Sequence, residues 1–121
     1  LKEVLEVARH EQKENARPEL AEKVNLADYD IIFLGYPIWY QDLPMPIYTF
    51  LESYDFAGKV IIPFSTGSGN AMSGKEADIP NYAKGAAAFP GMCIRGKTVR
   101  DNATETNKHI AVWLEGLGYH N

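Results

Sequence analysis

Residues 29–39 read YDIIFLGYPIW, and the apolar run inside them, residues 31–34, ends at Gly35. β-Branched and aromatic side chains dominate this run, which is typical of a strand buried on both faces in a parallel sheet. Similar runs follow at residues 60–64 (VIIPF) and 92–94 (MCI). Because Pro63 has no amide hydrogen, it predicts an edge position or a local break in the second strand.

Segments with helical spacing separate the three predicted strands. Apolar residues at i, i+3, i+4 and i+7 predict a helix from the first residue to about Asn15, and another helix begins near Pro46. Ser73 and Glu76 match a capping box, which predicts a short helix that Pro80 interrupts. This alternation predicts an α/β domain with a parallel, doubly wound sheet covered on both faces.

The last helix is predicted to start at a cap formed by Asn102 and Glu105 and to stop at Gly118. Trp113 lies on its apolar face and is expected in the core. We interpret residues 1–121 as a single domain, although three strands are few for such a sheet.

Composition excludes several classes of function. The chain has a net charge of −4, and its densest basic group, Arg95, Lys97 and Arg100, is too small to predict nucleic-acid binding. The single cysteine, Cys93, excludes an intrachain disulfide and a multi-cysteine metal site, and its apolar neighbours predict a buried thiol. The three histidines show no metal spacing. No apolar run reaches the roughly 20 residues of a membrane span, and a lone cysteine fits a reducing compartment, so we expect a cytoplasmic protein.

Two unusual loops follow the first two predicted strands. Residues 35–44 (GYPIWYQDLP) place three aromatic rings and two prolines in a loop, and residues 65–70 (STGSGN) form a loop of glycines and hydroxyls. In open α/β sheets, ligands bind beyond the carboxyl ends of the strands, where both loops would lie. Rings can stack on a flat ligand and glycine-rich backbone can approach its polar edge, so together the loops suit a flavin. Taken alone, the aromatic loop could instead pack its rings onto neighbouring helices, and the glycine-rich loop could be a flexible turn.

The same residues resemble the third strand and following loop of the flavodoxin-like family, in particular short bacterial flavodoxins and NAD(P)H-dependent FMN flavoproteins. The resemblance continues through DLPMP (42–46), FLE (50–52), PFSTGSG (63–69) and RG (95–96), and it covers essentially the whole chain.

The resemblance implies an FMN-binding, electron-transfer protein with a flavodoxin-like sheet, and it leaves open whether the chain is an FMN-dependent oxidoreductase. A redox partner protein or a nicotinamide cofactor would exchange electrons with it. It implies no catalytic side chain and no metal. The implied cofactor-binding residues are Pro37, Ile38, Trp39, Tyr40, Ser65, Thr66, Gly67, Ser68 and Gly69.

One departure from the family pattern affects the expected cofactor binding. Family members begin with a strand, a phosphate-binding loop, a helix and a second strand, and nothing before Asp28 matches these elements. We therefore expect a truncated sheet, impaired FMN binding, and a homo-oligomer formed through exposed sheet edges. Two other readings remain: a cofactor-free flavodoxin remnant that acts as an interaction module, and an α/β enzyme that holds a phosphorylated substrate at the glycine-rich loop.

Overall fold

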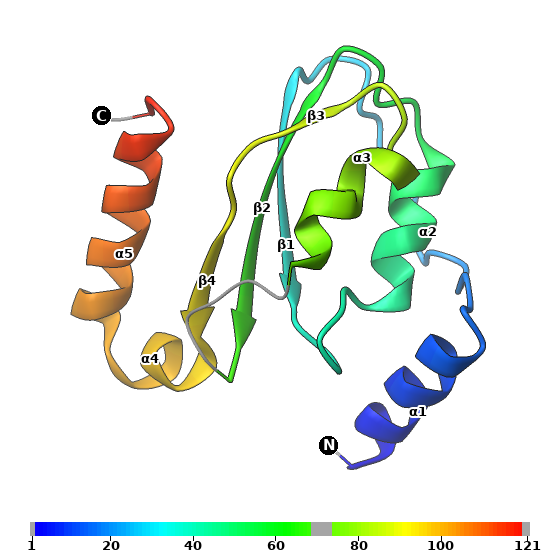
Figure 1. The fold of residues 1–121 in the computed structure, drawn as a ribbon, viewed down its shortest axis with the longest axis horizontal. Helices are drawn as coiled ribbons and strands as arrows, with labels where there is room; N and C mark the ends of the chain where they lie inside the picture. The colour runs from blue at the N-terminus through cyan, green and yellow to red at the C-terminus, as the bar shows by residue number, and fades with distance from the viewer. Residues whose placement is uncertain (1, 69–73, 120–121) are drawn as a thin grey trace.

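The computed structural model describes residues 2–68 and 74–119 (Figure 1). The elements follow one another as α1 (Lys2–Lys13), β1 (Ile31–Pro37), α2 (Met45–Ser53), β2 (Val60–Gly67), the 3₁₀ helix η1 (Lys75–Asp78), α3 (Ile79–Tyr82), β3 (Ala87–Ala88), β4 (Met92–Arg95), α4 (Gly96–Asp101) and α5 (Ala103–Gly116). All described strand pairs are parallel, as predicted.

The sheet is built around β2, which pairs with β1 on one side and with both β3 and β4 on the other. β1 does not end at Gly35 but continues to Pro37, in register with Thr66 of β2. Gly35 lies within the strand, and a Cβ atom there would come within 2.4 Å of the Phe64 ring on the neighbouring strand. The glycine therefore makes room for a ring and does not terminate the strand.

Pro63 lies in the central strand, so the predicted edge position is wrong. β2 itself runs unbroken from Val60 to Gly67, and the interruption lies in the row beside it: β3 pairs with Val60 and Ile61, and β4 pairs with residues 64–67. The amide of Phe89 donates to the carbonyl of Ile61, so odd-numbered residues of β2 direct their backbone groups to that side. The missing N–H of Pro63 thus faces the gap between β3 and β4.

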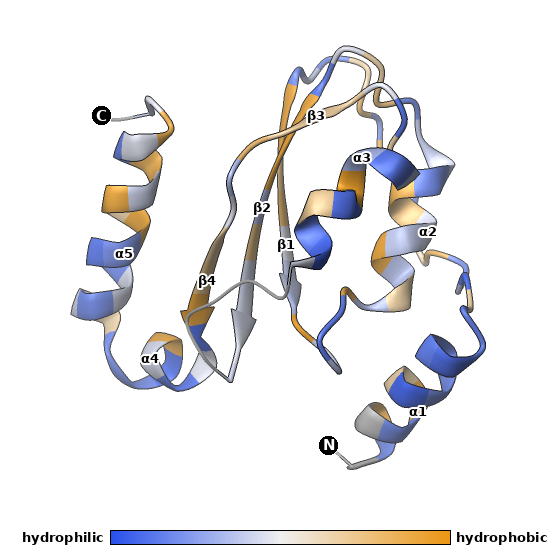
Figure 2. Ribbon diagram, viewed as in Figure 1, coloured by the Kyte–Doolittle hydropathy of each residue, from blue (hydrophilic) through white to orange (hydrophobic). Residues whose placement is uncertain are grey.

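The core fills one side of the sheet, where α2 and α3 pack (Figures 1 and 2). Side chains on this side come from even-numbered residues of β1, such as Leu34, and from odd-numbered residues of β2, such as Ile61, which is fully buried. Leu51 and Phe56 close the layer at 1% exposure each. Alternate burial along β1 explains why only half of its apolar run enters the core.

The opposite face of the sheet is only partly covered, by α5. Trp113 is half-buried there and not in the core as predicted; its ring contacts Phe33 and Phe64 with centroids 6.0 and 6.1 Å apart, respectively. Ile31, Phe33 and Phe64 remain 40%, 45% and 38% exposed. The prediction of a sheet covered on both faces therefore holds fully on one face only.

The outer edge of β1 pairs with no other strand of the described chain. The carbonyl of Asp30 and the amide of Ile38 both bond to β2, so the even-numbered residues direct their backbone groups inward. The odd-numbered residues Ile31, Phe33 and Gly35 consequently direct theirs to the open edge. This edge and the exposed face described above adjoin each other.

Several helix boundaries differ from the sequence predictions. The helix predicted near Gly74 is split into η1 and α3, and Pro80 lies in the first turn of α3 instead of interrupting a helix. Ser73 lies outside the described residues, whereas Glu76 accepts a hydrogen bond from the Gly74 amide at 2.9 Å. β3 and α4 were not predicted. None of the helices in the described ranges combines the length and the apolar character that crossing a bilayer demands.

Candidate functional site

The carboxyl ends of β1, β2 and β4 lie at one end of the sheet, and the two predicted loops meet there (Figure 1). The amide of Ile38, in the aromatic loop, donates to the carbonyl of Thr66 at 2.8 Å. A Cβ atom on Gly67 would lie 3.6 Å from Cδ1 of Ile38, so the two backbones are close neighbours. The first requirement of the flavin hypothesis, that both loops lie on one rim, is met.

The aromatic loop is organised by a tight turn at residues 39–42. Trp39 and Asp42 exchange two backbone hydrogen bonds, of 3.0 and 3.1 Å. Tyr40 and Gln41 between them have φ values of 51° and 67°, which is the pattern of a type I′ turn. Two successive non-glycine residues in the left-handed region cost about 1–2 kcal/mol each. Such strain is concentrated at functional sites and has to be offset by surrounding contacts.

Asp42 supplies part of that offset. Its Oδ1 accepts from the Leu43 amide at 2.7 Å and also from the Tyr48 hydroxyl of α2. Burial of Tyr48, followed by this hydrogen bond, raises the pKa of its hydroxyl above the ordinary value. The carboxylate therefore anchors the turn to α2.

The two rings of the turn, Trp39 and Tyr40, lean toward α1. The Arg9 guanidinium lies 5.8 Å from the Tyr40 ring centroid, and Gln12 donates to the Tyr40 carbonyl at 3.2 Å. Trp39 is half-buried, outside the core, and the described residues form no ring–ring contact with it. It borders an open, mainly apolar hollow of about 330 Å³ lined by Glu3, Val4, Val7, Ala8, Glu11, Trp39 and Pro46. An indole in this position is accessible for stacking.

The glycine-rich loop divides its side chains between two sides. Ser65 is 3% exposed and stands in register between Tyr36 and Cys93, and all three side chains are buried on the α2–α3 side. Thr66 and Gly67 are half-buried, and Ser68 is exposed. Gly69 lies outside the described residues. The backbone at positions 66–68 and the Ser68 side chain are therefore the parts of this loop best placed to meet a ligand at the rim.

Tyr36, one of the three rings predicted to lie in the aromatic loop, lies instead in β1 and is buried in the core. Its hydroxyl is buried and has no hydrogen-bond partner among the described residues. Burial first, and then the nearby Glu76, Cys93 and Asp42, raise the pKa of this hydroxyl above its ordinary value. The sequence gives no signal for this unpartnered hydroxyl, because a tyrosine at the end of an apolar strand is common and its partners cannot be read from the sequence.

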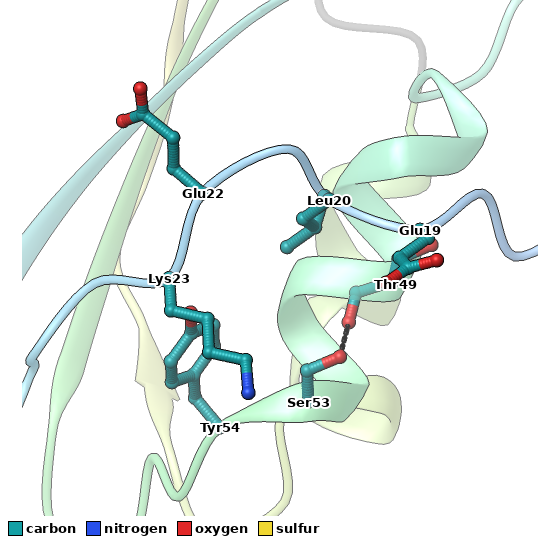
Figure 3. Close-up of a pocket in the computed structure, with 7 residues that line it drawn as sticks. All are labelled: Glu19, Leu20, Glu22, Lys23, Thr49, Ser53 and Tyr54. Atoms are coloured by element: carbon teal, nitrogen blue, oxygen red, sulfur yellow. Dashed lines mark hydrogen bonds between the residues drawn. The ribbon is translucent and has the colours of Figure 1, made fainter.

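A second hollow, of about 320 Å³, lies along α2 (Figure 3). Its lining residues are Glu19, Leu20, Glu22, Lys23, Thr49, Ser53 and Tyr54, none of which belongs to the two loops. The Ser53 hydroxyl donates to the Thr49 carbonyl within α2. Within residues 2–68 and 74–119, no three His, Cys, Asp or Glu side chains gather closely enough to hold a metal ion.

Comparisons with known proteins agree with this geometry. The family model described as flavodoxin matches residues 6–116. A protein of Bacteroides uniformis ATCC 8492 designated a flavoprotein is 37% identical over 74% of this chain and 59% of its own, with a TM-score of 0.67. No curated protein matches the chain.

Two further solved structures show the fold alone. One, from Bacteroides eggerthii DSM 20697 and also designated a flavoprotein, has 24% identity, a TM-score of 0.69, and coverage of 94% of this chain and 68% of its own. The other is a flavoprotein of Lactobacillus acidophilus NCFM in complex with FMN, with 22% identity, a TM-score of 0.56, and coverage of 88% and 67%. The chain thus spans between 59% and 68% of the lengths of these three proteins.

Proposed function

Because this chain belongs to the flavodoxin family, we propose that it binds FMN at the rim formed by its two loops and takes part in electron transfer. The observation that carries the proposal is the contact between the loops, in which the Ile38 amide bonds to the Thr66 carbonyl at 2.8 Å. This contact puts an aromatic wall and a glycine-rich backbone side by side, which is what a flat heterocycle with one polar edge needs.

The residues present fit the ring of a flavin. Trp39 is accessible and stacks on no other ring of the described chain, so one face of an isoalloxazine can lie against it. Backbone groups of Thr66, Gly67 and Ser68 can meet the pyrimidine edge, because the first two residues are half-buried and Ser68 is exposed. Pro37 lies in register with Thr66, the Ile38 amide bonds to the Thr66 carbonyl, and Ser65 is buried beneath them. When bound, FMN supplies the one- and two-electron chemistry, and the protein's part is stacking and hydrogen bonding.

We further propose that these 121 residues bind FMN weakly. A phosphate needs several charge-assisted hydrogen bonds, each worth about 1.5–3 kcal/mol. A phosphate-binding loop leads into the amino end of a long helix. The described residues offer no such loop at this rim: α4, which begins at Gly96 directly after β4, has only 6 residues. Without such a cradle, ring stacking would supply most of the affinity for FMN.

Titration followed by flavin fluorescence tests the proposal. The chain should quench the fluorescence of both FMN and riboflavin, with dissociation constants in the micromolar range or weaker. Trp39→Leu should weaken both ligands about tenfold, whereas Trp113→Leu, the matched control on α5, should leave both unchanged. Wild-type protein that quenches neither flavin at high concentration would refute flavin binding, and a nanomolar constant for FMN would refute the weak-binding statement.

A second candidate function is self-association as a cofactor-free interaction module. The observation in its favour is the open edge of β1 beside the exposed side chains Ile31, Phe33 and Phe64. An unpaired strand edge next to apolar surface is a template for pairing with another chain. We propose a homo-oligomer on this basis. For the flavin-bound chain, we propose a redox partner protein or a nicotinamide cofactor as the electron source.

A further inference from the structure

Two arginines flank the candidate site on the side of β4. Arg95 is the last residue of β4 and stands in register with Gly67. Arg100 belongs to α4, and its Nη1 lies 3.6 Å from the point that a Cβ atom on Gly96 would occupy. The Gly67 carbonyl oxygen lies 3.7 Å from that same point. The Arg100 guanidinium is therefore folded back over Gly96, toward the carboxyl end of β2.

In the described part of the chain, no carboxylate pairs with Arg100. No ion pair within 4.0 Å involves Arg100 in the described ranges, and the segment 69–73 contains no acidic residue. Asp101, its neighbour in sequence, pairs instead with Lys97 at 3.6 Å. Although the chain carries a net charge of −4, this corner of the molecule concentrates Arg95, Lys97 and Arg100 within six residues.

We propose that Arg100, assisted by Arg95, forms an anion subsite that takes a phosphate group of a nucleotide bound at the rim. A guanidinium presents a planar fork of N–H donors that matches phosphate oxygens, and the lack of side chains on Gly67 and Gly96 leaves access to it. The subsite is continuous with the proposed flavin site, because Gly67 adjoins both Gly96 and Ile38. The inference thus rests on the proposed function for its choice of a nucleotide.

The phosphate can come from two sources, the 5′-phosphate of FMN or a phosphate of a second nucleotide such as NADPH. Flavin fluorescence titrations with FMN and riboflavin, and NADPH fluorescence titrations, would be carried out at low ionic strength on wild type and Arg100→Gln. Lys108→Gln on α5 removes the same charge away from the rim and serves as the control. Unchanged thermal unfolding would show that Arg100→Gln folds normally.

For the first source, Arg100→Gln should weaken FMN about tenfold and leave riboflavin within twofold, because riboflavin lacks the phosphate. For the second source, it should weaken NADPH about tenfold and leave both flavins unchanged. Equal weakening of FMN and riboflavin, no weakening of any ligand, or the same effect in Lys108→Gln would overturn the subsite. If wild type bound neither flavin, the proposed function would fail while the NADPH titration still decided the subsite.

Discussion

Removing the hydroxyl of Tyr36 should stabilise the protein. The Tyr36 side chain is 5% exposed and its hydroxyl has no partner among the described residues, so folding strips this group of water without replacing the lost hydrogen bonds. Phenylalanine keeps the ring that packs in the core and deletes only the unsatisfied group. Tyr36→Phe is therefore a substitution in which the structure predicts a gain instead of the usual loss.

The expected gain follows from two opposing contributions. A buried polar group without a partner costs about 1–3 kcal/mol. Deleting the oxygen also leaves a small void, and the atoms that line it lose some van der Waals contacts. This loss cancels part of the stability gained by removing the unsatisfied hydroxyl. We expect a net gain of about 1 kcal/mol in the free energy of unfolding. For a chain of this size that corresponds to a rise in Tm of about 3–6 °C.

Tyr48→Phe is the matched control. Tyr48 is also 5% exposed, but its hydroxyl donates to the Asp42 carboxylate. Loss of a hydrogen bond to a charged group should destabilise the protein by about 1.5–3 kcal/mol. Urea denaturation followed by circular dichroism would measure both variants. The same chemical change should thus shift the unfolding free energy in opposite directions at the two sites.

Alkaline pH gives a second measure of the same perturbation. The folded protein raises the pKa of both tyrosines above the ordinary value of 10.0, so above pH 10 the unfolded chain loses protons that the folded chain keeps. The contribution of the two tyrosines to the free energy of unfolding is therefore fully present below pH 10. Above pH 10 it falls by about 1.4 kcal/mol per pH unit for each tyrosine. Tyr36→Phe should remove one of these two contributions to the slope.

A loss of more than about 0.5 kcal/mol in Tyr36→Phe would refute this reasoning. That result would mean that the hydroxyl is satisfied in solution, by buried water or by a group of residues 69–73. An unchanged alkaline slope in the variant would lead to the same conclusion, because it would show that Tyr36 ionises freely in the folded state.

Two further predictions concern the sheet. Gly35→Ala places a methyl group 2.4 Å from the Phe64 ring and should cost about 1–3 kcal/mol in urea denaturation, whereas Gly116→Ala, which has open space around it, should be neutral or gain up to about 1 kcal/mol. A neutral Gly35→Ala would show that the ring does not rest on the strand. Ile31→Lys should abolish self-association measured by sedimentation velocity, and Val112→Lys on the outer face of α5 should not; wild type that is monomeric at all concentrations would contradict the oligomer proposal.

Local signals carried most of the prediction of the fold. The apolar runs of β1, β2 and β4 stand out by composition, and the Asn102 cap is a short-range contact, confirmed by its hydrogen bond from the Glu105 amide at 3.0 Å. What sequence missed depends on distant partners. β3 is a pair of alanines that forms a strand only because β2 lies beside it, and Pro63 is tolerated at the centre only because the adjoining row is interrupted there.

The proximity of the two loops was also predictable from sequence. The rule that ligands bind beyond the carboxyl ends of parallel strands brought the two loops together, and the Ile38–Thr66 hydrogen bond shows them adjacent. The contacts of Arg9 with the Tyr40 ring, and the folding of Arg100 over Gly96, join segments whose approach no periodicity reports. The adjacency of the two loops could thus be inferred from sequence, but the surroundings of their residues could not.

The open edge of β1 and the candidate site are physically linked, because residues 35–37 border both. A strand that paired in parallel with β1 would end at the same rim as Ile38 and Thr66, and the loop after it would face the flavin site. A chain that paired in the antiparallel sense would bring its amino end there instead. Any partner on this edge therefore adds its own groups to the rim, so flavin affinity should depend on what pairs with β1. Measuring FMN binding across a range of protein concentrations separates the two functions: affinity that rises as the chain associates would mean that the edge completes the site, and constant affinity would mean that the edge and the site act independently.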